Sequence, residues 1–181
     1  MTTRTTLRRT AAALAVAGAA AGITALSTGT AAAQPTVFEC QSNQISSKLV
    51  YGGAGVGNRD AAIEFTANEG ERCTLPGKLA VGLAGDGSVQ AVSDAPEDAP
   101  SVALTNGSSA HVPLHWTDTE PKAEQHTPSA IHVQAPADSN PHGDPVNPDI
   151  ALPWTFGAVD ASADQHTVTV GAVTRGPAPT V

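Results

Sequence analysis

Aromatic side chains are scarce in this sequence, which holds two Trp, one Tyr and three Phe among 181 residues. Its Asp and Glu residues gather in loop-like stretches without an aromatic-lined platform. The sequence therefore does not indicate the paired carboxylates of a glycoside hydrolase site. Phe65 and Trp116 lie in segments that alternate like half-buried strands, and we expect both in the core. Trp154 and Phe156 follow Pro153 and are the candidates for an exposed recognition patch.

Basic residues and long apolar runs are also in short supply. The chain has 9 Lys and Arg against 17 Asp and Glu, which gives a formal net charge of −8. Such a surface repels nucleic acid and anionic lipid. Beyond Leu26, no apolar run approaches the roughly 20 residues that span a bilayer. We therefore expect no nucleic-acid partner. We also expect no stable membrane insertion if the N-terminal segment that contains the apolar run up to Leu26 is cleaved off.

Cysteine occurs only at Cys40 and Cys73. Two thiols without a clustered histidine are too few for a structural zinc site, and no CxxC spacing indicates a redox site. If the chain is exported, an even pair of cysteines most simply forms a disulfide. Closing a loop of this length is expected to stabilise the fold by about 3 to 4 kcal/mol.

The signatures of common catalytic sites are missing as well. The nucleophile elbow Gly-x-Ser-x-Gly does not occur, and the nearest sequence, Gly107–His111, fits a turn that leads into a strand. The glycine-rich run Gly52–Gly57 lacks the Gly-Lys-Ser/Thr ending of a phosphate-binding loop, so we expect it to connect two strands. The sequence therefore names no catalytic residue and no cofactor. A hydrolase whose triad is assembled from distant residues is the alternative.

The N-terminus contains the pattern of an export signal. Three arginines precede an uncharged apolar run over residues 11–26, and small residues at 31–33 stand just before Gln34. This order of basic, apolar and small-residue regions predicts a cleavable signal peptide over residues 1–33 and hence a secreted protein.

The rest of the sequence predicts one all-β domain over residues 34–174. Segments with period-two or β-rich character alternate with Gly, Pro, Asn and Asp, which is typical of an antiparallel β-sandwich. Fourteen prolines argue against long helices. The strands are expected at Thr36–Cys40, Ile45–Tyr51, Ala61–Ala67, Leu79–Leu83, Ser88–Val92, Ser101–Leu104, Ala110–Thr117, Ala130–Gln134, Ile150–Trp154 and Thr167–Val173.

Turn-forming residues predict how these strands connect. Gly85–Gly87 is expected to close a hairpin, and Asn106–Gly107 to form a second turn. Ser93–Pro100 is expected to be an exposed acidic loop, and Pro136–Pro148 a second, longer loop. The stretch 175–181 contains a glycine and two prolines and is expected to be a disordered tail.

The stretch Asp138–Asp149 holds the most pointed local pattern. Oxygen-bearing side chains fall at its positions 1, 3, 7 and 12 and a glycine at position 6, close to a twelve-residue calcium loop. Position 5 is His142, position 12 is Asp in place of the longer Glu, and three prolines oppose flanking helices. We favour an ordinary Pro/Asx turn loop, with a weak calcium site as the alternative.

Histidines supply the remaining metal-ligand candidates. His111 and His115 stand four residues apart on one expected strand and point to the same face, where His132 or Asp118 could join them. About 13 Å separates their Cβ atoms along an extended strand, too far for one ion. We therefore expect structural or solvent-facing histidines and no metal site.

Several short segments together carry a family resemblance. They are Gly53–Gly57, Ala61–Asn68, Cys73–Gly77, Gly85–Gly87, Val102–Ala110, Leu114–Asp118, Leu152–Pro153 and Thr167–Val170. In this order they resemble the actinobacterial secreted family catalogued as domain of unknown function 4232. The resemblance implies an immunoglobulin-like β-sandwich and a disulfide between Cys73 and Cys40. It implies no activity, because the family brings none.

These observations predict a non-catalytic binding or structural module. We expect it to be secreted and monomeric and to act at the cell exterior on an extracellular or cell-wall partner that the sequence does not name. Recognition loops of a sandwich lie at its ends, so Ser93–Pro100 and Pro136–Pro148 are the first candidates. A secreted hydrolase and a calcium-dependent adhesion module that uses residues 138–149 are the alternatives.

Overall fold

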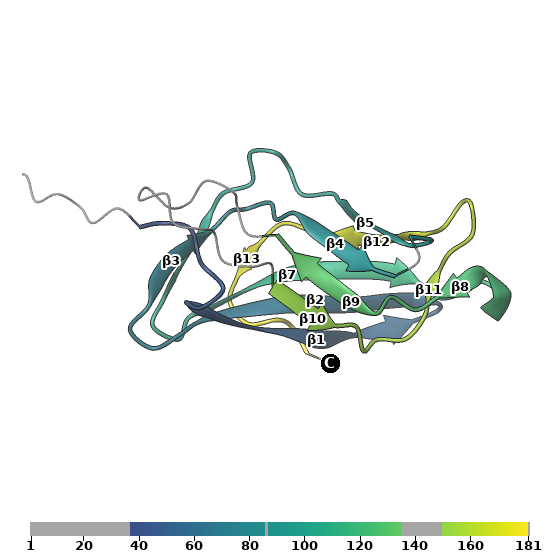
Figure 1. Cartoon of the computed structure of the whole chain (residues 1–181), viewed down its shortest axis with the longest axis horizontal. Coiled ribbons are helices and arrows are strands. Elements are labelled where there is room, and N and C mark those ends of the chain that lie inside the picture. Colours follow the sequence, from purple (N-terminus) through teal and green to yellow (C-terminus); the bar gives the residue numbers. More distant parts are fainter. Residues whose placement is uncertain (1–36, 86, 135–149, 181) are drawn as a thin grey trace, which may run out of the picture. The chain divides into compact units, whose positions relative to one another are not determined.

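Two layers of β-strands enclose one hydrophobic core in the computed structural model, which describes residues 37–85, 87–134 and 150–180 (Figure 1). The larger layer runs in the order β1 (Ile45–Gly55), β2 (Asn58–Ala67), β7 (Ser109–Thr117), β12 (Thr167–Val170) and β5 (Gln90–Ser93), with β13 (Thr174–Arg175) beside β7. The smaller layer runs in the order β10 (Ile150–Pro153), β9 (Ala130–Val133) and β4 (Val81–Ala84). The expected all-β sandwich is confirmed.

Two short ribbons complete the fold. One pairs β3 (Arg72–Leu75) with β6 (Val102–Thr105), and the other pairs β8 (Gln125–His126) with β11 (Val159–Asp160). A 3-10 turn, Lys122–Glu124, stands directly before β8. Within the described residues, no helix is long and apolar enough to cross a bilayer. The predicted signal peptide over residues 1–33 and the candidate calcium loop over residues 138–149 lie outside the described residues.

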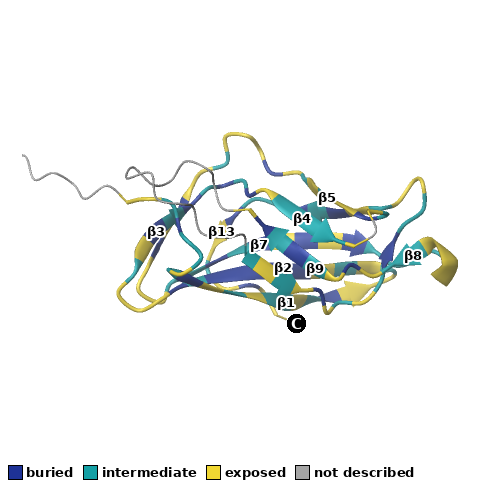
Figure 2. Ribbon diagram, in the orientation of Figure 1, coloured by how far each residue is buried: buried dark blue, intermediate teal, exposed yellow. Residues whose placement is uncertain are grey.

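Alternation in two central strands sets the face that the larger layer turns to the core. Across β2 and β7, Ile63 lies opposite Val112 and Phe65 opposite Ala110, and all four are 0 % exposed. Trp116, on the same face of β7, is 1 % exposed. Dark blue segments of these strands in Figure 2 mark this buried band. Phe65 and Trp116 are therefore core residues, as predicted.

Most strand pairs are antiparallel, with one exception in the larger layer. β5 and β12 run parallel, with Gln90 opposite Thr167 and Ser93 opposite Val170. Parallel strands need a long crossover, and here the chain between β5 and β12 includes β6 to β11. The antiparallel sandwich expected from the sequence therefore contains one parallel pair of strands.

A proline stands in the middle of the central strand β7. Pro113 accepts a hydrogen bond from the Gly171 amide at 2.9 Å, so its backbone faces the gap between β12 and β13. The N–H that proline lacks would point into the same gap. A Cβ at Gly171 would lie 2.6 Å from Pro113 Cγ, so glycine is needed there. The pairing along this side of β7 is therefore interrupted between β12 and β13, where Pro113 cannot donate a hydrogen bond.

The predicted turns differ from the structure mainly in the strands that they connect. Asn106 and Gly107 have φ of 39° and 81°, as expected of the turn, yet β6 and β7 belong to different sheets. The hairpin expected around Gly85 is wrong, because β4 pairs with β9 and β5 pairs with β12. The expected loop Gly52–Gly57 is mostly part of β1, and only Val56 and Gly57 form the turn.

The C-terminal segment expected to be disordered is ordered over residues 175–180. Arg175 belongs to β13, the Gly176 amide donates to the Ser109 carbonyl at 2.8 Å, and the Ala178 amide donates to Glu64 Oε2 at 2.7 Å. Ala178 is 7 % exposed. Glycine and proline oppose a helix, but they permit an extended segment that a buried carboxylate holds in place.

Replacing Glu64 with alanine is expected to release this C-terminal segment. Its carboxylate also pairs with Lys48 Nζ at 2.9 Å, and loss of a buried charged acceptor leaves the Ala178 amide without a partner. We expect a loss of about 2 kcal/mol in unfolding free energy and faster proteolysis after Arg175. Glu64→Gln, which keeps an acceptor oxygen, serves as the control. Unchanged cleavage in Glu64→Ala would contradict this assignment.

Candidate functional site

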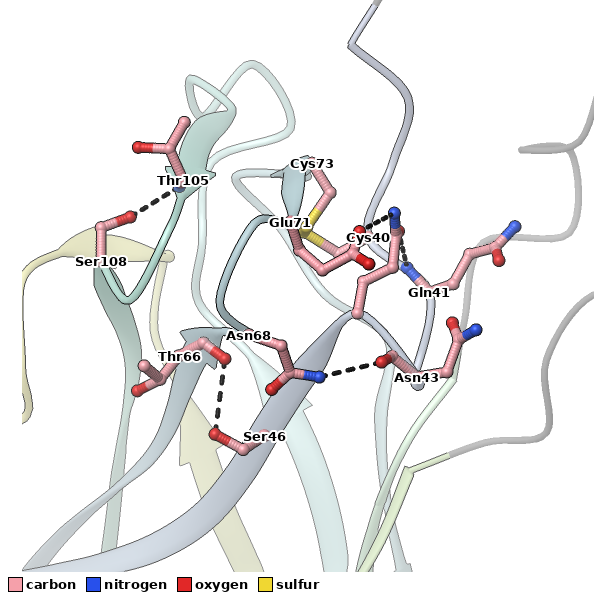
Figure 3. The surroundings of a disulfide bond; sticks show 11 residues. Cys40, Gln41, Asn43, Ser46, Thr66, Asn68, Glu71, Cys73, Thr105 and Ser108 are labelled. Carbon is pink, nitrogen blue, oxygen red and sulfur yellow. Dashed lines mark hydrogen bonds between the residues drawn. A yellow bond between two sulfur atoms is a disulfide. The ribbon is translucent and has the colours of Figure 1, made fainter.

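The predicted disulfide between Cys40 and Cys73 is present, with the two Cα atoms 4.7 Å apart (Figure 3). It fastens the first described segment to β3, where the Cys40 amide also donates to the Thr74 carbonyl at 3.0 Å. An apolar cavity of about 20 Å³ lies beside Cys40, which is room for about one water. The bond and its surroundings are structural.

The histidines singled out in the sequence are not gathered into one group, and two of them already have partners. His111 Nδ1 is 3.1 Å from the Gly176 carbonyl, and His115 Nδ1 is 2.9 Å from Asp60 Oδ1. In the part of the chain that the structure describes, no group of three His, Cys, Asp or Glu side chains is placed to hold a metal ion. His111, His115, His132 and Asp118 are therefore not brought together.

A row of polar side chains crosses the outer face of the larger layer. His115 lies opposite Asp60 on β2 and opposite Thr169 on β12. Asp, His and Thr are residue types that can form a hydrolytic triad. The side chains of His115 and Asp60 are 48 % and 61 % exposed. Water screens an ion pair at such exposure, so this row lacks the buried environment that activates a nucleophile.

Trp154 and Phe156 do not form the exposed recognition patch for which they were candidates. Trp154 is 7 % exposed and packs edge-on against Trp116, with ring centroids 5.0 Å apart. Phe156 contacts both rings and also Tyr51. The Trp154 Nε1–H donates to the Gly157 carbonyl at 2.7 Å. Trp116 and Trp154 belong to the hydrophobic core, and Phe156 packs against it.

Asp160 is a buried carboxylate that sequence analysis missed. It is 1 % exposed and accepts hydrogen bonds from the Thr119 amide at 3.0 Å and the Glu120 amide at 2.9 Å. The Thr119 hydroxyl at 3.1 Å and Gln125 Nε2 at 3.3 Å donate to it as well. A single side chain thus orders the connection between β7 and β8, which is a structural role.

Both buried carboxylates have lowered pKa values. Hydrogen bonds from the Ala178 amide and the Lys48 ammonium hold the pKa of Glu64 below its ordinary 4.5. Burial pushes the pKa of Asp160 upward, but hydrogen bonds from the Glu120 and Thr119 amides outweigh it and hold this pKa below 3.8. Each group therefore binds fewer protons in the folded than in the unfolded chain near its ordinary pKa.

The sign of the pH dependence follows from these two shifts. The stabilisation is complete above the unfolded pKa values and is lost as pH falls through the folded ones, so unfolding free energy should rise with pH in the acid range. Urea unfolding between about pH 2 and 6 measures the slope. The double variant with Glu64→Gln and Asp160→Asn should show a flatter profile. An identical slope in both proteins would contradict this prediction.

The acidic segment Ser93–Pro100 is exposed over much of its length, as predicted, and is anchored at both ends. The Asp94 amide donates to the Val170 carbonyl at 3.0 Å, and Glu97 forms an ion pair with Lys78. A Cβ at Gly77 would lie 2.2 Å from the Ala99 carbonyl oxygen, so only glycine lets the loop come this close. The loop is thereby held beside β4 and β5.

An open groove of about 470 Å³ lies next to this loop, within the range of natural ligand sites. It is lined by Lys78, Leu79, Ala80, Val81, Ala91, Ser93 and Glu97. One wall comes from β4 and the segment before it, and the other comes from β5 and the acidic loop. β4 and β5 are the last strands of their sheets and lie side by side (Figure 1).

Backbone N–H and C=O groups of β5 can form hydrogen bonds with a chain in this groove. The Gln90 amide donates to the His166 carbonyl and the Asp94 amide to the Val170 carbonyl, both towards β12. Successive residues of a strand direct their backbone groups to opposite sides, so those of Ala91 and Ser93 face the groove. In the sheets that the structure describes, β5 pairs with β12 alone. Its other edge is a template for an added strand.

The family comparison agrees with the resemblance in the sequence. A family model described as Domain of unknown function (DUF4232) matches residues 40–174. Neither the curated proteins nor the solved structures contain a match. The matched range covers most of the chain and contains every strand from β1 to β12, together with Cys40 and Cys73. The chain therefore belongs to the domain of unknown function 4232 family.

Proposed function

We propose that this protein is a non-catalytic binding module that acts outside the cell and takes an extended peptide segment along the free edge of β5. The observation that carries the proposal is the groove of about 470 Å³ beside Ala91 and Ser93. Strand addition at a sheet edge is a common mode of peptide recognition, in which backbone hydrogen bonds supply affinity. A four-residue edge accommodates about four peptide residues, since each spans about 3.3 Å.

Export is supported by the N-terminal pattern and by the disulfide. Disulfides persist in oxidising compartments, and the Cys40–Cys73 bond fixes the described chain just after the predicted signal peptide. N-terminal sequencing of the protein recovered outside the cells should begin at or near Gln34. A cell-retained protein that begins at Met1 would overturn this part of the proposal.

Selection of peptides from a random displayed library tests the binding mode. We expect enriched sequences to be proline-poor and rich in β-branched residues, because they must adopt a strand. Ala91→Pro should abolish their binding, since it removes a groove-facing N–H at an edge position where proline is tolerated. Val92→Thr is the matched control, because Val92 is 47 % exposed and does not line the groove.

Two outcomes decide the proposal. If no sequence is enriched, or if enriched peptides bind Ala91→Pro as tightly as the parent protein, strand addition at β5 is wrong. Should Ala91→Pro fail to fold, peptides N-methylated at alternate residues replace it. Methylation in one of the two phases must then abolish binding, because only one phase donates to β5.

A further inference from the structure

We propose that the groove between β4 and β5 selects a cationic peptide, in which a Lys or Arg side chain takes the place of Lys78 on Glu97. This inference rests on the proposed function and adds the chemical class of the partner. It starts from the charges around the groove. The loop Ser93–Pro100 carries three exposed carboxylates and no basic residue. They belong to Asp94, Glu97 and Asp98.

Lys78 is the cation that lines the groove, and it stands against these carboxylates. Its ammonium group pairs with Glu97 Oε1. The side chain of Glu97 is 88 % exposed and that of Lys78 is 33 % exposed. Exposed ion pairs contribute little stability, so a peptide cation can replace Lys78 at small cost. Glu97 is therefore available to an incoming chain.

The position of Glu97 connects this charge to strand addition. Ala91 and Ser93 offer their backbone groups on one wall of the groove, and Glu97 lines the same groove. A peptide that pairs with β5 thus passes the carboxylate. The chain as a whole has a net charge of −8, which steers cationic partners towards it.

The same charges disfavour two other occupants. A second copy of this chain would bring a second acidic loop against the first, and like charges across an interface oppose association. An acidic peptide meets the same repulsion. The partner that fits this groove is therefore an extended, cationic segment of another exported protein, whose side chains alternate between the two faces of the added strand.

Three acetylated hexapeptides test this selection, with valine alternating with lysine, glutamine or glutamate. We expect the lysine peptide to bind about tenfold more tightly than the glutamine peptide at low salt, and the glutamate peptide more weakly than both. The difference between the lysine and glutamine peptides should shrink at high salt, because salt screens exposed charges. Fluorescence anisotropy of labelled peptides measures all three affinities.

Two variants assign the effect to the ion pair. Glu97→Gln should weaken the lysine peptide about threefold, whereas Lys78→Gln should strengthen it about threefold by freeing Glu97. Neither variant should change the affinity for the glutamine peptide. Glu69→Gln is the matched control, since it removes one exposed carboxylate that does not line the groove.

The outcomes separate this inference from the function on which it rests. Equal binding of all three peptides, with loss of binding in Ala91→Pro, would overturn cationic selection and leave strand addition standing. Tighter binding of the lysine peptide that Glu97→Gln leaves unchanged would overturn the role of Glu97. Failure of every peptide to bind would overturn both proposals.

Discussion

Exchange of both Cys40 and Cys73 for alanine is expected to lower the free energy of unfolding by about 3 to 4 kcal/mol. The bond closes a loop with a sequence separation of 33, and its removal frees the unfolded chain to adopt many more conformations. For a domain of this size, such a loss lowers the melting temperature by about 10 °C. Thermal unfolding followed by circular dichroism measures the shift.

Chemical reduction is the control for this double substitution. The reduced parent protein should melt close to the double variant, because both lack the same cross-link. Cys73 is 0 % exposed, so alanine replaces it with little change in burial. A double variant that melts within about 2 °C of the oxidised parent would contradict the role given to the disulfide.

Replacement of Asp160 by alanine is expected to cost about 3 kcal/mol of unfolding free energy. The carboxylate accepts hydrogen bonds from two backbone amides, those of Thr119 and Glu120, and from two side chains. Alanine removes the acceptor that these donors share at a buried position, and hydrogen bonds to a charged group are worth about 1.5 to 3 kcal/mol each. Denaturant unfolding at neutral pH measures the loss.

A neighbouring carboxylate supplies the matched control for Asp160. Asp118 forms an ion pair with Arg59 at 2.6 Å, with side chains 21 % and 29 % exposed. Asp118→Ala should cost about 1 kcal/mol, because solvent screens this pair. In Asp160→Ala, amide exchange at Thr119 and Glu120 should also accelerate. Equal losses in the two variants would contradict the central position given to Asp160.

Local periodicity was sufficient to predict most of the sandwich. Alternation over Ala110–Thr117 predicted both the strand and its buried face, because side chains on successive residues point to opposite sides. Strand partners were harder to predict. Gly85 predicted a turn, but no local signal shows that β4 and β5 separate into different sheets. Sheet pairing depends on contacts between distant segments, which local sequence patterns do not encode.

The order of the C-terminal segment shows another limit of the sequence. Its glycine and prolines are typical of mobile tails, whereas its order depends on Glu64, 114 positions away from Ala178. Nothing near Arg175 in the sequence indicates that partner. A glutamate within the otherwise apolar run Ala61–Phe65 of β2 was the available signal, because buried charges are found where they have partners.

The candidate site was less predictable still, because it consists mainly of backbone. Ala91 and Ser93 carry small side chains that no motif singles out, and their N–H and C=O groups become a site only at the edge of the sheet. The acidic loop Ser93–Pro100 was one of the two loops that the sequence indicated as candidates for recognition, and this stays a prediction. Its part in the site follows from Glu97, which faces the groove.

Amide hydrogen exchange along β5 tests the proposed site most directly. The amides of Ala91 and Ser93 should exchange rapidly in the free protein and at least about tenfold more slowly with the valine–lysine hexapeptide bound. The amides of Gln90 and Asp94, already bonded towards β12, should be protected in both states. Saturating peptide that leaves Ala91 and Ser93 unprotected would contradict strand addition at this edge.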